Sequence, residues 1–192
     1  SQIFKGAKHT LRVYSFYRVN PKAGKADTSA WMQQKRSLQN ANIDEDPRKN
    51  AVAAILAEIQ QHIQNGDYII LMGDLNETVT GREKTNNKFE NIGLVNVMKE
   101  RLQTTTLPRT HKRGSQAIDH VWISASLLNS VNACGYAPFD YIGQSDHRGI
   151  YLDVHINSIL DADIYSLQPT KHRRLKATIP KRVLKYLEIM EK

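Results

Sequence analysis

The sequence contains a single cysteine, Cys134, so an internal disulfide framework is excluded. The lack of disulfides favours a reducing compartment, and Cys134 is most simply a small core residue. No apolar run approaches the length needed to cross a bilayer, and no secretory signal pattern opens the sequence. Internal repeats and low-complexity tracts are absent as well. We therefore expect an intracellular protein, nuclear or cytoplasmic, that does not act at a membrane.

Length and charge narrow the class of protein further. The 192 residues suffice for one core with an appendage. Lys and Arg number 27 against 19 Asp and Glu, which gives a formal net charge of +8. Such a balance favours a polyanionic partner, either nucleic acid or an anionic membrane surface. Since we find no apolar loop suited to a bilayer, nucleic acid is the favoured partner.

The most informative stretch is residues 68–76, Tyr-Ile-Ile-Leu-Met-Gly-Asp-Leu-Asn. Its apolar start predicts a buried strand, and Gly73 permits a sharp turn directly before Asp74 and Asn76. Ligands of α/β sheets bind at the carboxyl ends of strands, where these two side chains could hold a water and a phosphate oxygen together. Gly, Asp and Asn are also ordinary turn residues, so this stretch alone favours a simple turn.

Two later stretches change that interpretation. Residues 117–124, Ala-Ile-Asp-His-Val-Trp-Ile-Ser, alternate like a strand that contains Asp119, and residues 144–149, Gln-Ser-Asp-His-Arg-Gly, precede an apolar strand over 150–156. In this order, the three stretches resemble the endonuclease/exonuclease/phosphatase superfamily, which includes deoxyribonuclease I, apurinic endonucleases and the endonucleases of non-LTR retrotransposons. The resemblance implies an α/β fold of the deoxyribonuclease I type, a four-layer α/β/β/α sandwich of two mixed β-sheets.

The resemblance also implies a role for each residue of these stretches. Asp74 would orient or deprotonate the attacking water, and Asn76 would fix that water against the phosphate. His147 would meet a phosphoryl oxygen, while Asp119 would hold the His147 ring and raise its proton affinity. Asp146 would ligate Mg²⁺ or Mn²⁺, ions that prefer oxygen ligands.

Further contacts to the substrate are implied outside these stretches. Tyr17, a catalytic candidate, and Asn20 lie at the end of a strand over residues 11–19, where apurinic endonucleases carry a Tyr and an Asn that contact phosphate. A basic loop before the Asp119 strand would meet backbone phosphates through Arg109, Lys112 and Arg113. His111 lies in this loop, but a lone histidine among basic residues is more often simply on the surface.

The sequence departs from the superfamily pattern at its start. The superfamily's principal metal-ligating Glu lies upstream of the Tyr17 strand, whereas Glu45 is the first Glu here. We therefore expect residues 1–157 to form the later part of an N-terminally incomplete domain, and residues 158–192 a basic linker or helical extension. A larger protein, a partner chain that completes the domain and a degenerate homologue all remain open.

The remaining pattern predicts helices and one long loop. Residues 29–38 predict a helix capped at its start, and a second helix begins at Pro47 after the cap Asp46 and ends at 65–66. Residues 77–88 predict a surface loop, and residues 89–102 a helix with Ile92, Val95 and Leu102 toward the core. Trp122 is expected in the core, and His120 and Arg148 in structural or surface positions.

These observations predict divalent-metal-dependent phosphodiester hydrolysis by an endonuclease that acts on DNA, with the retroelement type favoured. One alternative is a phosphatase or phosphodiesterase of small or lipid phosphoesters. Another is a catalytically silent nucleic-acid-binding homologue that keeps the later motifs without the upstream Glu.

Overall fold

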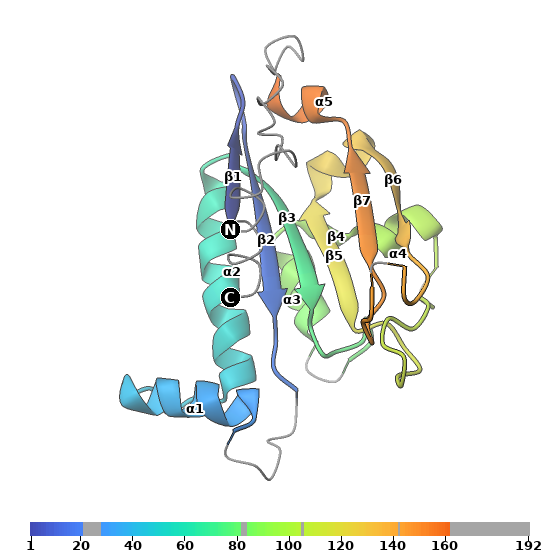
Figure 1. Cartoon of the computed structure of the whole chain (residues 1–192). Helices are drawn as coiled ribbons and strands as arrows, with labels where there is room; N and C mark the ends of the chain where they lie inside the picture. The colour runs from blue at the N-terminus through green and yellow to red at the C-terminus, as the bar shows by residue number, and fades with distance from the viewer. Residues whose placement is uncertain (21–27, 82–83, 105, 142, 162–192) are drawn as a thin grey trace, which may run out of the picture. The chain divides into compact units, whose positions relative to one another are not determined.

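The computed structural model describes residues 1–20, 28–81, 84–104, 106–141 and 143–161 (Figure 1). From residue 162 onward, the predicted basic extension lies outside this part of the chain. Among the described residues, no helix combines the length and the apolar character that crossing a membrane requires.

A mixed sheet of five strands forms the centre of the fold. Its strands, in spatial order, are β1 (Gln2–Lys5), β2 (Thr10–Tyr17), β3 (Tyr68–Asp74), β5 (Asp119–Ser124) and β4 (Leu94–Asn96). Only β2 and β3 run parallel, and every other neighbouring pair is antiparallel. Because parallel neighbours need a long crossover, the two helices between β2 and β3 make this connection.

These two crossover helices begin where the sequence predicts. In α1 (Ala30–Asn40) the Ser29 hydroxyl accepts a hydrogen bond from the Met32 N–H. In α2 (Pro47–Gln64) the Asp46 carboxylate accepts from the N–H groups of Arg48 and Lys49. The caps satisfy backbone donors that have no partner inside a helix.

One apolar core lies between the five-stranded sheet and the helices on one of its faces. Ile59 of α2 and Phe89 of α3 (Thr85–Asn91) are completely buried against the sheet. The sheet contributes the alternate residues that face the helices, namely Tyr14, Ile69, Leu71 and Trp122. Trp122 therefore lies in the core, as the strand alternation predicts.

A second core lies on the opposite face of the same sheet. The antiparallel pair β6 (Val131–Tyr136) and β7 (Ile150–Val154) covers this face, and Figure 1 shows the pair beside β5. Val121 and Ile123 of β5 meet apolar residues of this pair, and α5 (Ile156–Leu160) adds Ile159 and Leu160. The predicted α/β fold with two sheets packed face to face is thus confirmed.

The predicted loop over 77–88 and helix over 89–102 are wrong in part. Helix α3 begins inside the predicted loop, and a strand and a short helix, β4 and α4 (Val97–Leu102), replace the single helix. Gly93 has φ +86°, which ends α3, and β4 then pairs with β5 at the sheet edge. Leu102 is 46% exposed and not in the core. Strands β1 and β6 were not predicted.

Candidate active site

A row of three polar side chains crosses the end of the five-stranded sheet. Tyr17 is the register partner of Asp74 across β2 and β3, and Asp74 is the partner of Asp119 across β3 and β5. Alternation places this row on the face that carries Met72 and Val121, the face covered by the second sheet. The row stands at the open end of that core, and Tyr17 is 52% exposed there.

The turn after β3 fixes both carboxylate oxygens of Asp74. A side chain at Gly73 would meet the Phe16 carbonyl oxygen, so only glycine allows β2 to approach this closely. Asn76 adopts φ +46°, a left-handed conformation that Asn tolerates. Its backbone N–H donates to Asp74 Oδ1 at 2.8 Å, and its Nδ2 donates to Asp74 Oδ2 at 3.1 Å and to the Arg18 carbonyl at 2.7 Å.

Burial raises the pKa of the Asp74 carboxyl above its usual value. The hydrogen bond from the Asn76 backbone opposes this rise in pKa, and the nearby negative charge of Asp119 adds to it. A carboxyl whose pKa is raised is a stronger base once it is ionised. Asp74 therefore combines a fixed orientation with increased basicity.

His147 lies directly beside Asp119. Its Nδ1 is 2.9 Å from Asp119 Oδ2, and the two side chains are 31% and 13% exposed. Although burial alone disfavours the imidazolium, the hydrogen bond and charge of Asp119, with the charges of Asp74 and Asp146, raise the pKa of His147. Because Nδ1 donates to Asp119, Nε2 is the ring atom left to face a substrate.

Asp146 is the exposed member of the cluster. Its side chain is 67% exposed, and His111 Nε2 lies 3.2 Å from its Oδ2. Burial acts to raise the pKa of Asp146, but its own backbone N–H, the His111 hydrogen bond and the charges of His111 and His147 lower it. A carboxylate that stays ionised and exposed suits a cation.

Sequence reasoning missed two residues of the loop before β5. His111, interpreted as surface, lies edge-on to His147 with ring centroids 4.8 Å apart. Thr110 is completely buried, and its hydroxyl accepts hydrogen bonds from the N–H groups of Ile118 and Asp119 at 3.0 and 3.1 Å. Its carbonyl accepts from the Arg148 N–H at 2.7 Å, so Thr110 connects the two segments that carry Asp119 and His147.

A buried charged pair, Arg18 and Glu77, lies next to the turn that carries Asp74 and Asn76. Arg18 Nη1 donates to Glu77 Oε2 at 2.7 Å, and both side chains are nearly inaccessible. His120 Nε2 lies 2.8 Å from the Glu77 carbonyl oxygen, and burial lowers the pKa of His120, which favours the neutral ring. His120 thus has a structural place. Glu77 was missed because its segment was predicted to be an exposed loop.

The structure keeps the other predicted contacts apart from the carboxylate cluster. Asn20 is exposed, at the last described position after β2. The Arg109 and Arg148 guanidinium groups lie 5.6 and 4.5 Å from the Phe139 ring centroid, and Lys112 Nζ pairs with Asp140 at 2.6 Å. Arg113 is exposed beside His111. Of these residues, Lys112 and Arg113 directly follow His111, whose ring contacts Asp146 and His147.

The donor set allows a test of metal binding. Ligand atoms of Asp74, Asp119 and His147 lie within 4.8 Å of one another, and so do those of His111, Asp146 and His147. Asp119 and His147 are occupied with each other, whereas the Asp146 carboxylate is exposed and has His111 at one of its oxygens. This set fits an oxygen-preferring divalent ion that one or two carboxylates hold and water completes.

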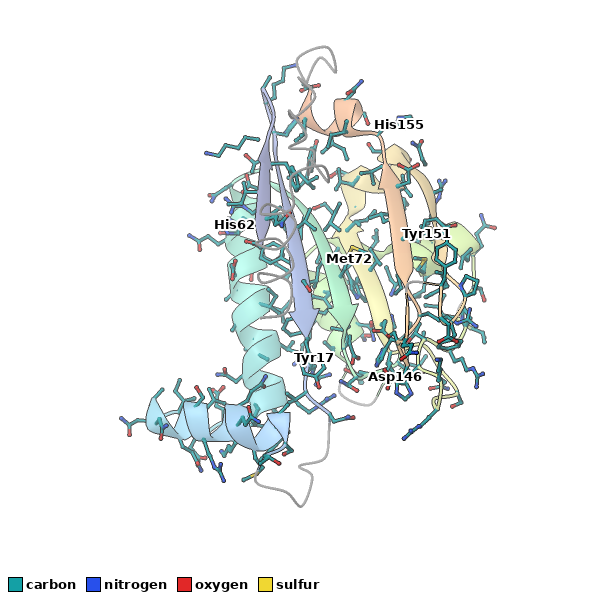
Figure 2. All side chains as sticks on the ribbon, in the orientation of Figure 1. Tyr17, His62, Met72, Asp146, Tyr151 and His155 are labelled. Atoms are coloured by element: carbon teal, nitrogen blue, oxygen red, sulfur yellow. The ribbon has the colours of Figure 1, made fainter. Side chains whose placement is uncertain are left out.

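Figure 2 shows the placement of the cluster relative to other polar groups. Tyr17 and Asp146 lie at the same end of the sheets, while His155 lies at the far end of the strand that follows Asp146. Within the described residues, side chains from four separate segments of the chain thus lie at the same end of the sheets.

Searches with the sequence find no matching family model and no matching curated protein. Solved structures do match by shape. The 3′ phosphatase NExo from Neisseria, solved with a product DNA hairpin, aligns over 80% of this chain and 63% of its own length, with 15% identity and a TM-score of 0.52. The 3′-5′ exonuclease NExo from Neisseria meningitidis aligns over 75% and 61%, with 16% identity and a TM-score of 0.51.

The chain therefore spans less than two thirds of the length of these two neighbours. At this identity the likeness is one of fold, and it confirms the deoxyribonuclease I-like α/β fold that the sequence motifs predict.

Proposed function

We propose that this chain carries the hydrolytic centre of a divalent-metal-dependent phosphodiesterase that cleaves DNA internally, as an endonuclease. The observation that carries the proposal is the row of Tyr17, Asp74 and Asp119 with His147 bonded to Asp119 at 2.9 Å. A base, an imidazole and a neighbouring exposed carboxylate are the groups that hydrolysis of a phosphodiester requires.

Asp74 acts on the attacking water. Both of its oxygens are held by Asn76, so its remaining lone pairs have fixed directions. The amide of Asn76 is itself held by the Arg18 carbonyl, which leaves its oxygen to orient the water or the phosphate. The raised pKa of Asp74 makes its carboxylate a stronger general base once it is ionised.

His147 acts on the phosphoryl group. With Nδ1 bonded to Asp119, its Nε2–H donates to a phosphoryl oxygen as negative charge develops there. The raised pKa of His147 keeps the ring charged over a wider range of pH. The exposed Tyr17 hydroxyl, in the same row, supplies a further donor to the phosphate.

The metal, which we assign as Mg²⁺ or Mn²⁺, would be held by Asp146 and water. When bound, such an ion neutralises charge on the phosphoryl oxygens and the leaving oxygen. Asp146 and His147 are adjacent in sequence, so the residue that holds the ion and the residue that meets the phosphate are positioned together.

The substrate assignment rests on charge and on the basic loop that carries His111. The net charge of +8 and the exposed Arg113 and Lys112 favour a polyanion. Asn20, beside the Tyr17 strand, and Arg109 would contact flanking phosphates. The two structural neighbours are named as a 3′ phosphatase and a 3′-5′ exonuclease, whereas the basic stretch that follows the domain in the sequence favours the retroelement type of endonuclease, so the test must separate ends from interior sites.

The test is cleavage by the 192-residue chain of supercoiled plasmid and of a duplex with a labelled 3′ end, with Mg²⁺, with Mn²⁺ and with a chelator. We expect metal-dependent nicking that is weak, because no Glu precedes Tyr17 in this sequence, and that Asp74→Asn and His147→Asn abolish. Asp153→Asn and His155→Asn are matched controls, because these side chains are exposed on and just after β7 and lie away from the row.

The outcomes separate the alternatives. Release of only 3′ groups or terminal nucleotides would replace the endonuclease by an end-processing enzyme. Cleavage of small or lipid phosphoesters, with DNA left intact, would support the phosphatase alternative. Binding of DNA with no metal-dependent cleavage of any of these substrates would leave the silent binding module.

A further inference from the structure

The loop before β5 and the segment before β7 are paired through their backbones. His111 and His147 form a β-bridge, with the Lys112 N–H donating to the Asp146 carbonyl at 2.7 Å and the Arg148 N–H donating to the Thr110 carbonyl at 2.7 Å. The backbone on each side of His111 is therefore fixed to the backbone on each side of His147. This pairing places the His111 ring next to the Asp146 carboxylate.

A backbone donor decides which nitrogen of His111 carries the proton. The Arg113 N–H donates to His111 Nδ1 at 3.1 Å, so Nδ1 is an acceptor. In a neutral imidazole the other nitrogen is then the donor. His111 Nε2–H accordingly donates to Asp146 Oδ2, 3.2 Å away.

The same hydrogen bond argues against His111 as a metal ligand. Its ligand atom lies within 4.8 Å of those of Asp146 and His147. A metal at Nε2 would need a proton at Nδ1, where the Arg113 N–H already points. His111 is thus suited to hold a carboxylate, and the second oxygen of Asp146 is left to a cation.

We propose that His111 is a positioning residue that orients the Asp146 carboxylate for a divalent cation and supports the His147 ring at its edge. The edge-on contact between the His111 and His147 rings, with ring planes at 78°, limits movement of the His147 ring while Nδ1 is hydrogen-bonded to Asp119. One side chain thereby couples the residue that holds the ion to the residue that meets the phosphate. The inference rests on the proposed function, because it takes Asp146 as the metal ligand.

Three substitutions at His111 separate positioning from simple filling of the loop. His111→Gln places an amide Nε2–H near the position of the ring Nε2 and keeps the donor to Asp146. His111→Asn keeps a short amide that can accept from the Arg113 N–H but does not reach Asp146. His111→Ala removes both. His155→Ala is the matched control, because His155 is an exposed histidine at the far end of β7.

The measurement is Mn²⁺ affinity of the 192-residue chain without substrate, from the electron paramagnetic resonance signal of free Mn²⁺. We expect His111→Ala and His111→Asn to weaken Mn²⁺ binding about 10-fold, since hydrogen-bond partners of metal ligands contribute roughly 10- to 100-fold. His111→Gln should recover most of the affinity, and His155→Ala should match the unchanged chain. Nitrogen-15 NMR of the imidazole should show the Nε2-protonated tautomer at His111.

Three results would overturn the inference, and one of them would also overturn the metal assignment of the proposed function. If Asp146→Asn weakens Mn²⁺ binding but His111→Ala and His111→Asn do not, the proposed function stands and the positioning role is wrong. If Asp146→Asn leaves Mn²⁺ affinity unchanged, Asp146 is not the ligand and the metal assignment of the proposed function fails with it. An Nδ1-protonated tautomer at His111 would also refute the positioning role.

Discussion

Asp119→Asn tests the centre of the proposed mechanism with almost no change in shape. Asp119 Oδ2 and His147 Nδ1 are 2.9 Å apart, and the substitution removes the charge while an amide oxygen can still accept. Two unit charges about 4 Å apart attract by about 1 kcal/mol in water and about 4 kcal/mol at an effective dielectric constant near 20. With side chains 13% and 31% exposed, this pair lies between those limits.

We take about 2 kcal/mol for the lost attraction between the two side chains. Because about 1.4 kcal/mol changes a rate tenfold, this loss corresponds to roughly a 30-fold fall in kcat. The fall should appear in kcat with little change in KM, because the imidazolium is needed where charge develops. The assay is metal-dependent plasmid nicking over a range of pH, with Asp153→Asn as the control for the same substitution on an exposed strand position.

The pH profile gives a second readout with a definite sign. Activity falls as pH rises through the pKa of His147, because the ring loses its charge. Asp119 raises that pKa, so Asp119→Asn should move the fall in activity to lower pH. A variant that folds normally, nicks at the wild-type rate and keeps the wild-type pH profile would refute the assigned role of the pair.

Three further predictions address stability and binding. Burial lowers the pKa of His120 in the folded protein. The stability that neutral His120 contributes is therefore present above about pH 6.5, the usual pKa of histidine, and is lost as pH falls through the lower folded pKa. His120→Asn should flatten the pH dependence of the free energy of unfolding, measured by urea denaturation between pH 7.5 and 5.5. Glu77→Ala removes the buried carboxylate that Arg18 Nη1 contacts, and calorimetry should show a loss of about 3 kcal/mol in the free energy of unfolding. Arg113→Ala should weaken DNA binding and reduce the slope of affinity against salt by about 1 on logarithmic scales, with kcat nearly unchanged; an unaltered slope in a fluorescence titration would remove Arg113 from the interface.

The sequence predicted best what local chemistry determines. Asp46 and Pro47 predict the start of α2, because an N-cap residue and a residue without an N–H both suit the first turn of a helix. The Gly73 turn placed Asp74 at a strand end, where the structure has it, and strand alternation placed Asp119 within a strand over 117–124, which in the structure begins at Asp119 itself.

What the sequence did not predict depends on pairing between distant segments. Residues 94–96 are too short and too apolar to distinguish a strand from a helix, and pairing with β5 decides the outcome. Glu77 is buried because Arg18 lies opposite it, and His111 matters because it pairs with His147. No periodicity within either local segment carries this information.

The row of Tyr17, Asp74 and Asp119 has a consequence for how the protein refolds. Tyr17 and Asp74 meet only when β2 and β3 pair in parallel across both crossover helices. Closing the long loop between β2 and β3 loses chain entropy before the strand contacts can stabilise it, so such pairings form late. A capped helix such as α2 forms within microseconds. During refolding, helical circular dichroism should therefore recover before catalytic activity does, and the delay between the two signals should lengthen in variants that weaken the β2–β3 pairing.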